Sequence, residues 1–422
     1  GGIALPRCHF RGFCLAVPTA MKAWLQLVLL EAALHGARGL ASQAVLGSCP
    51  GDLEVTGLGW VSLIPTGWVP EGWVPPPSSE AASNASESRR LGLLWSDAEA
   101  EAMMLPQGNF SPAAVKVDQG HTVRTGLDGR SYFAELGACD GTYSNEKYLA
   151  LNLLGKTMRF TTDLAGAGCG CNVAFYLLPL KHNRHKSECF DYYCDANDVC
   201  GESCAEIDIM EGNMHAFHST LHSAHDHDGK AEGYGGGSDA GYEGWSGPRD
   251  WNATQYGPKG RCINTHKPFQ VSVSFPTNEA GSLEAMTVML TQEDSPCPLA
   301  VTITDYNGNP ELTSALSQGM TPIFSYWKDE GMLWLDGEGA DGEGPCRRDH
   351  PGRCADAVRF YDFKIEKDGG GLTTKEDLKG TKVELVPQAS APAPSGGNPW
   401  WQPPEAQAPA PAAPAGGNPW WQ

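Results

Sequence analysis

Short strand-like segments separated by glycine-rich turns fill the middle of this chain, from about residue 129 to residue 367. In three of them apolar and polar residues alternate, as they do on a strand with one buried face. The apolar members are Phe269, Val271, Val273 and Phe275, then Met158 and Phe160, and finally Tyr361, Phe363 and Ile365. Because no long helical pattern intervenes, the sequence predicts an all-β sandwich of two sheets.

Two further segments refine this prediction. Residues 173–178 are continuously apolar, which favours a strand buried on both faces. The segment from Glu311 to Gln318 predicts a short helix that ends at Gly319, a residue suited to a C-cap. Ser96 and Glu99 form a capping box that predicts another short helix over 100–105.

The charge balance narrows the classes of partner. The 422 residues carry 30 Lys and Arg against 50 Asp and Glu, a formal net charge of −20. Neutralising phosphates requires clustered basic residues, so we expect neither nucleic acid nor an anionic membrane as a partner. With 51 Gly and 31 Pro the chain is also unsuited to long helical repeats.

Cysteine usage indicates an oxidising compartment. Twelve cysteines follow Met21, an even number scattered through a large domain, which favours structural disulfides. A zinc site is the alternative, but paired Cys-x-x-Cys units at finger-like spacing are missing. The twelve are Cys49, Cys139, Cys169, Cys171, Cys189, Cys194, Cys200, Cys204, Cys262, Cys297, Cys346 and Cys354.

The two ends of the chain differ from its middle. Residues 1–20 resemble translated upstream sequence, and residues 21–41 resemble a signal peptide, so we expect secretion. Residues 42–129 form a Gly/Pro/Trp-rich extension that either is loosely ordered or wraps the core. Residues 130–369 form the sandwich, and residues 370–422 are a Pro/Ala-rich tail with two Gly-Gly-Asn-Pro-Trp-Trp-Gln repeats. We expect a soluble protein, because no segment after the signal peptide has 18 uninterrupted apolar residues. Asn84 and Asn252 are candidate glycosylation sites.

The most informative motif is a run of three acids, Glu206, Asp208 and Glu211, interleaved with apolar residues. On a regular strand Glu206 and Asp208 share a face, whereas Glu211 has the opposite parity. A one-residue bulge after Asp208 would bring all three carboxyls onto one face.

Such a cluster suits general acid and nucleophilic catalysis. Mutual repulsion separates the pKa values of neighbouring carboxyls, so one can stay ionised while another holds a proton. The side chains of Glu206 and Glu211 could lean to the separation of roughly 5–5.5 Å that retaining glycosidases need. A solvated acidic edge or a calcium site would be the alternatives, but the interleaved apolar residues argue against a solvated loop.

The pattern Glu-x-Asp-x-x-Glu resembles the signature of the jelly-roll glycosidases, glycoside hydrolase families 7 and 16. Several flanking segments, within about 130–366, are similar to family 7, the secreted cellulases. They are Cys169-Gly-Cys-Asn-Val-Ala-Phe-Tyr176, Tyr193-Cys194-Asp195, Asp250-Trp251-Asn252, Tyr256-Gly257-Pro258 and the Trp327 to Asp336 region. The resemblance implies a concanavalin A-like jelly roll with a substrate cleft on its concave sheet.

The resemblance also implies roles for individual residues. Glu206 would be the nucleophile, Glu211 the general acid/base, and Asp208 would hold the nucleophile's geometry and charge. The substrate-binding residues would be Asn172, Tyr176, Asp195, His222, Trp327 and Trp334, with core packing as the alternative role for the two tryptophans. It further implies a Cys194–Cys204 disulfide and a bridge from Cys169 to Cys346 or Cys354.

Two features depart from the family pattern. Met210 replaces a common tryptophan and Gly212 replaces an alanine. The segments between motifs are shorter than in tunnel-forming cellobiohydrolases, which predicts an open cleft and internal cleavage.

A run of histidines follows the acidic motif, from His215 to His227. It offers a zinc pair only if His218 and His222 lie on a helix, and we favour substrate-binding or surface roles for these histidines.

The leading interpretation is therefore a secreted, monomeric, retaining β-1,4-glucanase that needs no cofactor or metal and acts on β-glucan. A β-1,3-glucanase of the family 16 type is the enzymatic alternative. A non-catalytic wall-polysaccharide-binding protein is the other, although such a protein gains nothing from two close, mutually repelling glutamates.

Overall fold

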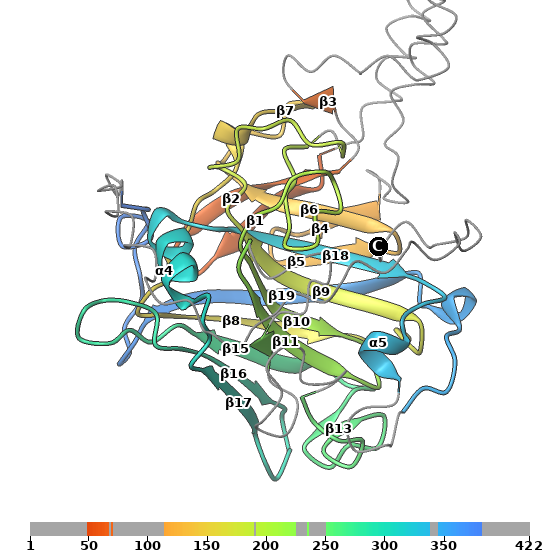
Figure 1. The fold of residues 1–422 in the computed structure, drawn as a ribbon. Coiled ribbons are helices and arrows are strands. Elements are labelled where there is room, and N and C mark those ends of the chain that lie inside the picture. The colour runs from red at the N-terminus through yellow and green to blue at the C-terminus, as the bar shows by residue number, and fades with distance from the viewer. Residues whose placement is uncertain are drawn as a thin grey trace, which may run out of the picture. The chain divides into compact units, whose positions relative to one another are not determined.

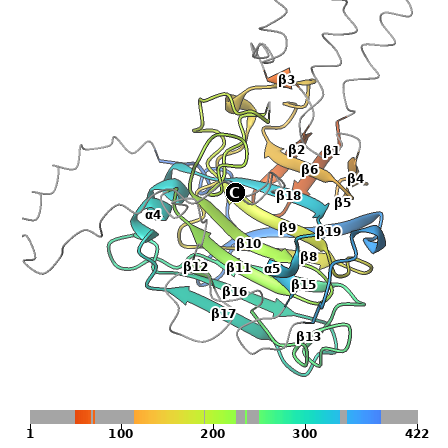
Figure 2. The same ribbon diagram turned by 45° about the vertical axis from the view of Figure 1, so that its right-hand side comes forward.

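The computed structural model describes residues 49–66, 69–70, 114–189, 191–224, 234–235, 250–337 and 345–381. Two large antiparallel sheets form the framework of this part of the chain, and they lie one upon the other (Figures 1 and 2). The prediction of an all-β, two-sheet sandwich is confirmed.

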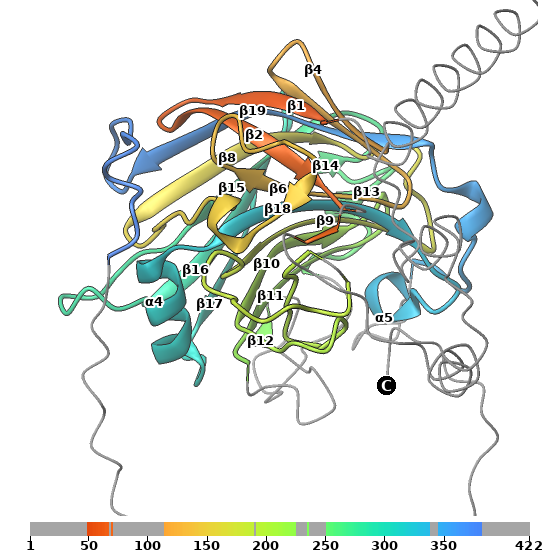
Figure 3. The same ribbon diagram turned by 90° about the horizontal axis from the view of Figure 1, so that it is seen from above.

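The first sheet has eight strands, and the central ones carry the acidic motif. Its spatial order is β1 (Gly51–Val55), β2 (Gly59–Pro65), β6 (Gly129–Ala134), β18 (Thr321–Lys328), β9 (Cys171–Leu178), β10 (Glu206–Gly212), β11 (Phe217–His222) and β12 (Tyr234–Gly235). Viewed from above, β18, β9, β10 and β11 follow one another across this sheet (Figure 3).

The second sheet has seven strands. Its order is β17 (Leu299–Thr304), β16 (Ala285–Thr291), β15 (Phe269–Ser274), β8 (Lys156–Asp163), β19 (Ala357–Lys367), β5 (Thr122–Gly126) and β4 (Val115–Asp118). Two short parallel pairs, helices α4 and α5, and two 3-10 turns complete the described elements. They are β13 (Tyr256–Gly257) with β14 (Ile263–Asn264), β3 (Val69–Pro70) with β7 (Thr142–Tyr143), α4 (Asn309–Gln318), α5 (Leu333–Asp336), η2 (Asn145–Lys147) and η3 (Pro351–Arg353).

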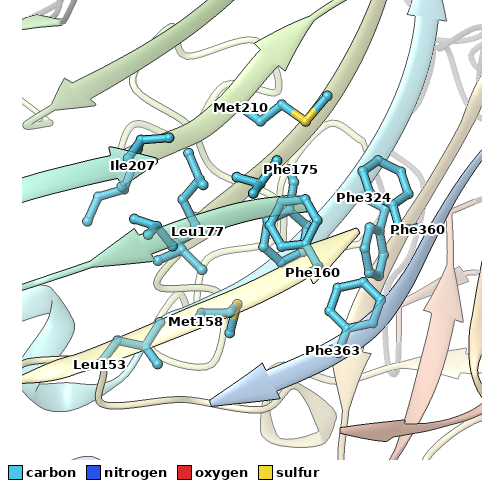
Figure 4. Packing of buried hydrophobic residues seen from close by; sticks show 14 of the residues in the cluster. Leu153, Met158, Phe160, Phe175, Leu177, Ile207, Met210, Phe324, Phe360 and Phe363 are labelled. Atoms are coloured by element: carbon cyan, nitrogen blue, oxygen red, sulfur yellow. The ribbon is translucent and has the colours of Figure 1, made fainter. Parts of the chain in front are cut away.

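The main hydrophobic core lies between the two sheets. Phe175 of β9 and Phe324 of β18 meet Phe160 of β8 and Phe360 of β19, with ring centroids 4.6 Å apart for Phe160 and Phe175 (Figure 4). Ile207 and Met210 of β10 point into the same core. Burying aromatic rings of this size contributes about 1.5–3 kcal/mol each, so this layer fixes which face of β10 turns outward.

Most of the local predictions hold. The predicted strands correspond to β15, β8 and β9, and every residue of β9 is buried, as its continuous apolar run requires. Helix α4 begins two residues earlier than expected and ends before Gly319, whose φ of +106° suits a glycine. The capping-box helix over 100–105 lies outside the described residues.

The alternation predicted for β19 is wrong at one position. Phe363 and Ile365 are buried as expected, but Tyr361 lies outside the core and Phe360 takes its place. A bulge between Tyr361 and Lys364, with Asp362 at a φ of +57°, shifts the register by one residue. A single extra residue reverses the face on which all earlier side chains lie.

Strands from before residue 130 take part in both sheets. β1 and β2 form one edge of the eight-stranded sheet, and β4 and β5 form one edge of the seven-stranded sheet. Leu53 and Val55 of β1 are fully part of the core. The sandwich thus begins before residue 130, because β1, β2, β4 and β5 belong to its two sheets.

All twelve cysteines after Met21 form disulfides, as predicted. The bridges are Cys49–Cys139, Cys169–Cys346, Cys171–Cys354, Cys189–Cys200, Cys194–Cys204 and Cys262–Cys297. The Cys194–Cys204 pair is confirmed, and Cys346 is the partner of Cys169. The bridged cysteines lie between 10 and 183 residues apart in the chain. Such bridges stabilise the fold chiefly by restricting the unfolded chain.

Within the described residues, no helix is both long and apolar enough to cross a membrane. The signal-peptide segment and the tail repeats lie outside those residues.

Candidate active site

A bulge in β10 brings the three acids onto one face, which we call the site face: the face of the eight-stranded sheet turned away from the core. Glu206 and Asp208 pair with His222 and Thr220 of β11, and after a one-residue shift Glu211 pairs with His218. The same shift occurs against β9. The predicted bulge after Asp208 is confirmed.

Each of the three carboxyls has a defined partner. The backbone N–H of Ala196 donates to Glu206 Oε2 at 2.9 Å, and Asn172 Nδ2 donates to Glu211 Oε1 at 2.9 Å. His222 Nε2 lies 3.3 Å from Asp208 Oδ2. Because these partners come from different elements, each carboxyl is held in a separate orientation.

Burial governs the electrostatics of the cluster. Glu206 and Asp208 are only 7% and 5% exposed. Burial, with the neighbouring Asp208 and Asp195 carboxyls, raises the pKa of Glu206 well above its ordinary value. Burial and the Glu211 charge do the same to the pKa of Asp208. Burial and the mutual repulsion of four carboxyls (Glu206, Asp208, Glu211 and Asp195) therefore make the cluster hold protons to a higher pH than isolated carboxyls would.

The pKa of Glu211 is also raised by burial, but two groups oppose the shift. The hydrogen bond from Asn172 and the nearby His222 both favour the ionised form. A carboxyl whose environment pulls in both directions can release and regain a proton, as an acid/base group must.

Asp195 and Tyr176, two of the predicted sugar-binding residues, lie beside the cluster. Asp195 accepts the backbone N–H of Val199 at 3.0 Å, and burial raises the pKa of its carboxyl, which contributes to the raised pKa of Glu206. The hydroxyl of Tyr176 lies 3.3 Å from that of Tyr193. The Cys194–Cys204 bridge joins this loop directly to the start of β10.

The two predicted tryptophan platforms are half-buried. Trp327 of β18 lies opposite Asn172 of β9, and Trp334 belongs to α5. Both pack against a small cluster of Ala216, Met332 and Leu335. Part of each indole thus serves core packing, and the remainder is accessible.

The sequence did not predict the buried Arg130–Asp191 ion pair. Arg130 Nη2 lies 3.2 Å from Asp191 Oδ2, and its guanidinium lies 4.0 Å from the centroid of the Tyr193 ring. Asp191 also accepts the hydroxyl of Tyr132. The partners are 61 residues apart in the chain, and no motif links them.

Among the described residues one group has the composition of a metal site: Cys169, His215 and Cys346, whose candidate ligand atoms lie within 4.8 Å of one another. Both cysteines are joined in a disulfide, so neither offers a thiolate. His218 and His222 lie on a strand rather than on a helix, so the helical zinc pair does not form. His225 and His227 lie outside the described residues.

Known proteins resemble this chain in sequence and in fold. No protein-family model matches it. Endoglucanase EG-1 of Hypocrea jecorina is 29% identical over 242 residues, which cover 48% of this chain and 49% of that protein. Endoglucanase 1 of Pyricularia oryzae is 27% identical over 271 residues, covering 52% and 63%. The chain thus spans about half the length of the first of these relatives.

Two solved structures share the fold. An endoglucanase I complexed with cellobiose superposes with a TM-score of 0.52 at 19% identity, covering 76% of this chain and 98% of that one. A GH7-family cellobiohydrolase from Daphnia pulex gives a TM-score of 0.50 at 15% identity, covering 76% and 97%. The chain is thus similar in sequence to curated endoglucanases and has the same fold as these two solved structures. Strand β10 of this chain carries Glu206, Asp208 and Glu211 on the outward face of a sandwich sheet.

Proposed function

We propose that this protein is a retaining glycoside hydrolase of family 7 that cleaves β-1,4 bonds of cellulose-type glucans. One observation carries the proposal: the bulge in β10 places Glu206, Asp208 and Glu211 side by side on the site face. The names of the similar proteins, endoglucanases and a cellobiohydrolase, support the substrate class.

In the first half of the reaction Glu211 acts as general acid. Its raised pKa keeps a proton available, which passes to the glycosidic oxygen as the bond breaks. Glu206 attacks the anomeric carbon from the other side and forms a covalent glycosyl-enzyme. The nearby His222 and the N–H of Ala196 favour the ionised form of Glu206 and so oppose the burial and neighbouring acids that raise its pKa.

In the second half Glu211, now ionised, takes a proton from water. The water attacks the anomeric carbon, the bond to Glu206 breaks, and the sugar leaves with its original configuration. Asn172 holds the Glu211 carboxylate during this exchange through its hydrogen bond to Oε1. Asp208, paired with His222, lies between the two glutamates along the strand. It would hold the geometry and the charge of the nucleophile Glu206.

The remaining predicted residues would bind the glucan. Tyr176, Asp195 and His222 border the nucleophile, and the accessible parts of Trp327 and Trp334 would stack on pyranose rings. The short segments between motifs favour an open cleft and internal cleavage. We further propose that the enzyme is secreted and acts as a monomer.

The test is reducing-sugar release by the purified protein on soluble cellulose and on laminarin. We expect release from soluble cellulose, and none from the Glu206→Gln variant, because an amide cannot act as the nucleophile. The variant should still be retarded in gels that contain soluble cellulose, since its shape is preserved. If Glu206→Gln melts at the same temperature as wild type, the loss of activity comes from the missing nucleophile and not from unfolding.

Other outcomes point elsewhere. Release from laminarin alone would favour the β-1,3-glucanase alternative. Binding without release on either glucan would favour a polysaccharide-binding protein, and full activity of Glu206→Gln would overturn the nucleophile assignment.

A further inference from the structure

Strand β11 places a row of side chains directly opposite the three acids. His222 lies across from Glu206, Thr220 across from Asp208, and His218 across from Glu211. Directly opposite residues of antiparallel strands have Cβ atoms about 4.5–5.5 Å apart and point to the same face. The His218 ring therefore borders Glu211 on the β11 side, while Asn172 binds Glu211 from the β9 side.

His218 is buried and anchored by Asp250. Its Nδ1 atom lies 3.5 Å from Asp250 Oδ1, and the two side chains are 2% and 0% exposed. Asp250 is itself fixed at the edge of β11. Its N–H donates to the carbonyl of Phe217 at 2.6 Å, and its Oδ2 accepts the hydroxyl of Ser219 at 2.9 Å. These contacts leave the anchor little freedom to move.

Burial acts on the charge of both side chains. Burial lowers the pKa of His218 to about 3, with a further contribution from His222, and burial raises the pKa of Asp250 to about 8. Burial therefore favours the uncharged form of each side chain. An uncharged ring beside Glu211 excludes water without adding a positive charge that would lower the pKa of the acid.

The other groups near Glu211 are two titratable side chains and one amide that binds it directly. Asp208 on β10 interacts with it as a like charge, and His222 on β11 lowers its pKa. Asn172, the partner from β9, is uncharged. On the α5 side Asp336 accepts Asn213 Nδ2 at 2.7 Å, just past the end of β10.

We propose that His218, anchored by Asp250, is a positioning residue for Glu211: it closes the β11 side of the carboxyl to water and holds it in the orientation for proton transfer. The inference rests on the proposed function in assigning Glu211 as the acid/base. The register that sets His218 opposite Glu211 is a property of the fold.

The test compares His218→Ala with His218→Gln and with the distant control Glu366→Gln. In His218→Ala water reaches Glu211, so its pKa should fall by about one unit. The alkaline limb of the pH profile for soluble cellulose should shift to lower pH by the same amount. Turnover (kcat) should fall about tenfold or more while KM changes less than twofold, because orientation rather than binding is lost.

His218→Gln supplies an uncharged side chain of similar reach and should recover most of the rate and of the pH limb. Glu366→Gln should match wild type in both. A merely structural role would lower the melting temperature of His218→Ala yet leave the pH limb of the folded enzyme in place, and that result would overturn the proposal.

A second measurement separates this proposal from the proposed function. NMR titration of the side-chain carboxyl carbons in glutamate-labelled wild type and His218→Ala reports the pKa of Glu211 whether or not the protein turns over. A shift in inactive protein would support the positioning contact and refute the glucanase. An unchanged pKa in an active enzyme would refute the positioning contact alone.

Discussion

The pKa values of two glutamates, one on each sheet of this sandwich, are shifted in opposite directions. On the seven-stranded sheet, Glu366 of β19 binds Lys364 Nζ at 2.6 Å and Arg159 Nε at 2.9 Å, and these hydrogen bonds lower its pKa. On the eight-stranded sheet, burial and neighbouring acids raise the pKa of Glu206 well above its ordinary value.

Both residues occupy the outward side of their strand, so alternation alone does not distinguish them. The difference comes from what surrounds each carboxyl. The outer face of β8 and β19 supplies basic partners, as for Asp163 with Arg359 at 3.2 Å. The site face supplies other acids and covers them. A carboxyl there is costly to ionise, and that cost is what catalysis can use.

The largest difference should come from removing one acid from each face. Glu211→Gln should lower activity on soluble cellulose by about 10²–10⁴-fold, because the leaving oxygen is no longer protonated. The loss should be much smaller for an aryl cellobioside whose phenolate leaves without a proton. Glu366→Gln should stay within about twofold of wild type on both substrates. Equal losses on the two substrates would contradict the acid/base role of Glu211.

A smaller effect should appear in the pH dependence of stability. Burial raises the pKa of Asp336 from 3.8 to about 6, so its contribution is complete below 3.8 and is lost as the pH rises through 6. Between pH 4 and 6.5, wild type should therefore lose about 5 °C of melting temperature relative to Asp336→Asn. Calorimetry at a series of pH values measures this difference.

Asp377 provides the control of opposite sign. Hydrogen bonds from Lys367 and Thr374 lower its pKa to about 2, so its contribution is present above 3.8 and is lost as the pH falls through 2. Asp377→Asn should be slightly less stable than wild type at neutral pH and should converge with it in strong acid. Parallel curves for the two variants would contradict the assigned shifts.

The smallest effect should come from the Arg159–Glu366 pair. Both side chains are partly exposed, at 31% and 19%, so water screens their attraction. A double-mutant cycle of Arg159→Ala and Glu366→Ala, followed by urea unfolding, should give a coupling of about 0.2–1 kcal/mol. A coupling of several kcal/mol would mean that this face is as poorly solvated as the site face.

The sequence predicted the fold wherever strands follow a strict period of two. β15 and β8 follow that period and were placed correctly. β19 was misread at Tyr361, because a bulge at an aspartate leaves no mark in the hydrophobic pattern. β1 was missed although Leu53 and Val55 alternate with acids, since glycine and tryptophan around it hid a pattern only five residues long.

The candidate site was predictable where residues lie close along one strand. The spacing of Glu206, Asp208 and Glu211 already required a bulge, because apolar Met210 has to face the core. The pairs His218–Asp250 and Arg130–Asp191 were not predictable in this way. Their partners come together only through strand register and loop closure, which a single sequence does not specify.

The bulge in β10 also makes changes of strand length unequal in their consequences. Loss of Ile209 would restore strict alternation, and all three acids would still face outward, at a shorter spacing. Gain of one residue at the same point, without a second bulge, would turn Glu211 inward and bring Met210 to the surface. At the bulge a one-residue deletion thus preserves the facing of the three acids, whereas a one-residue insertion inverts that of Glu211.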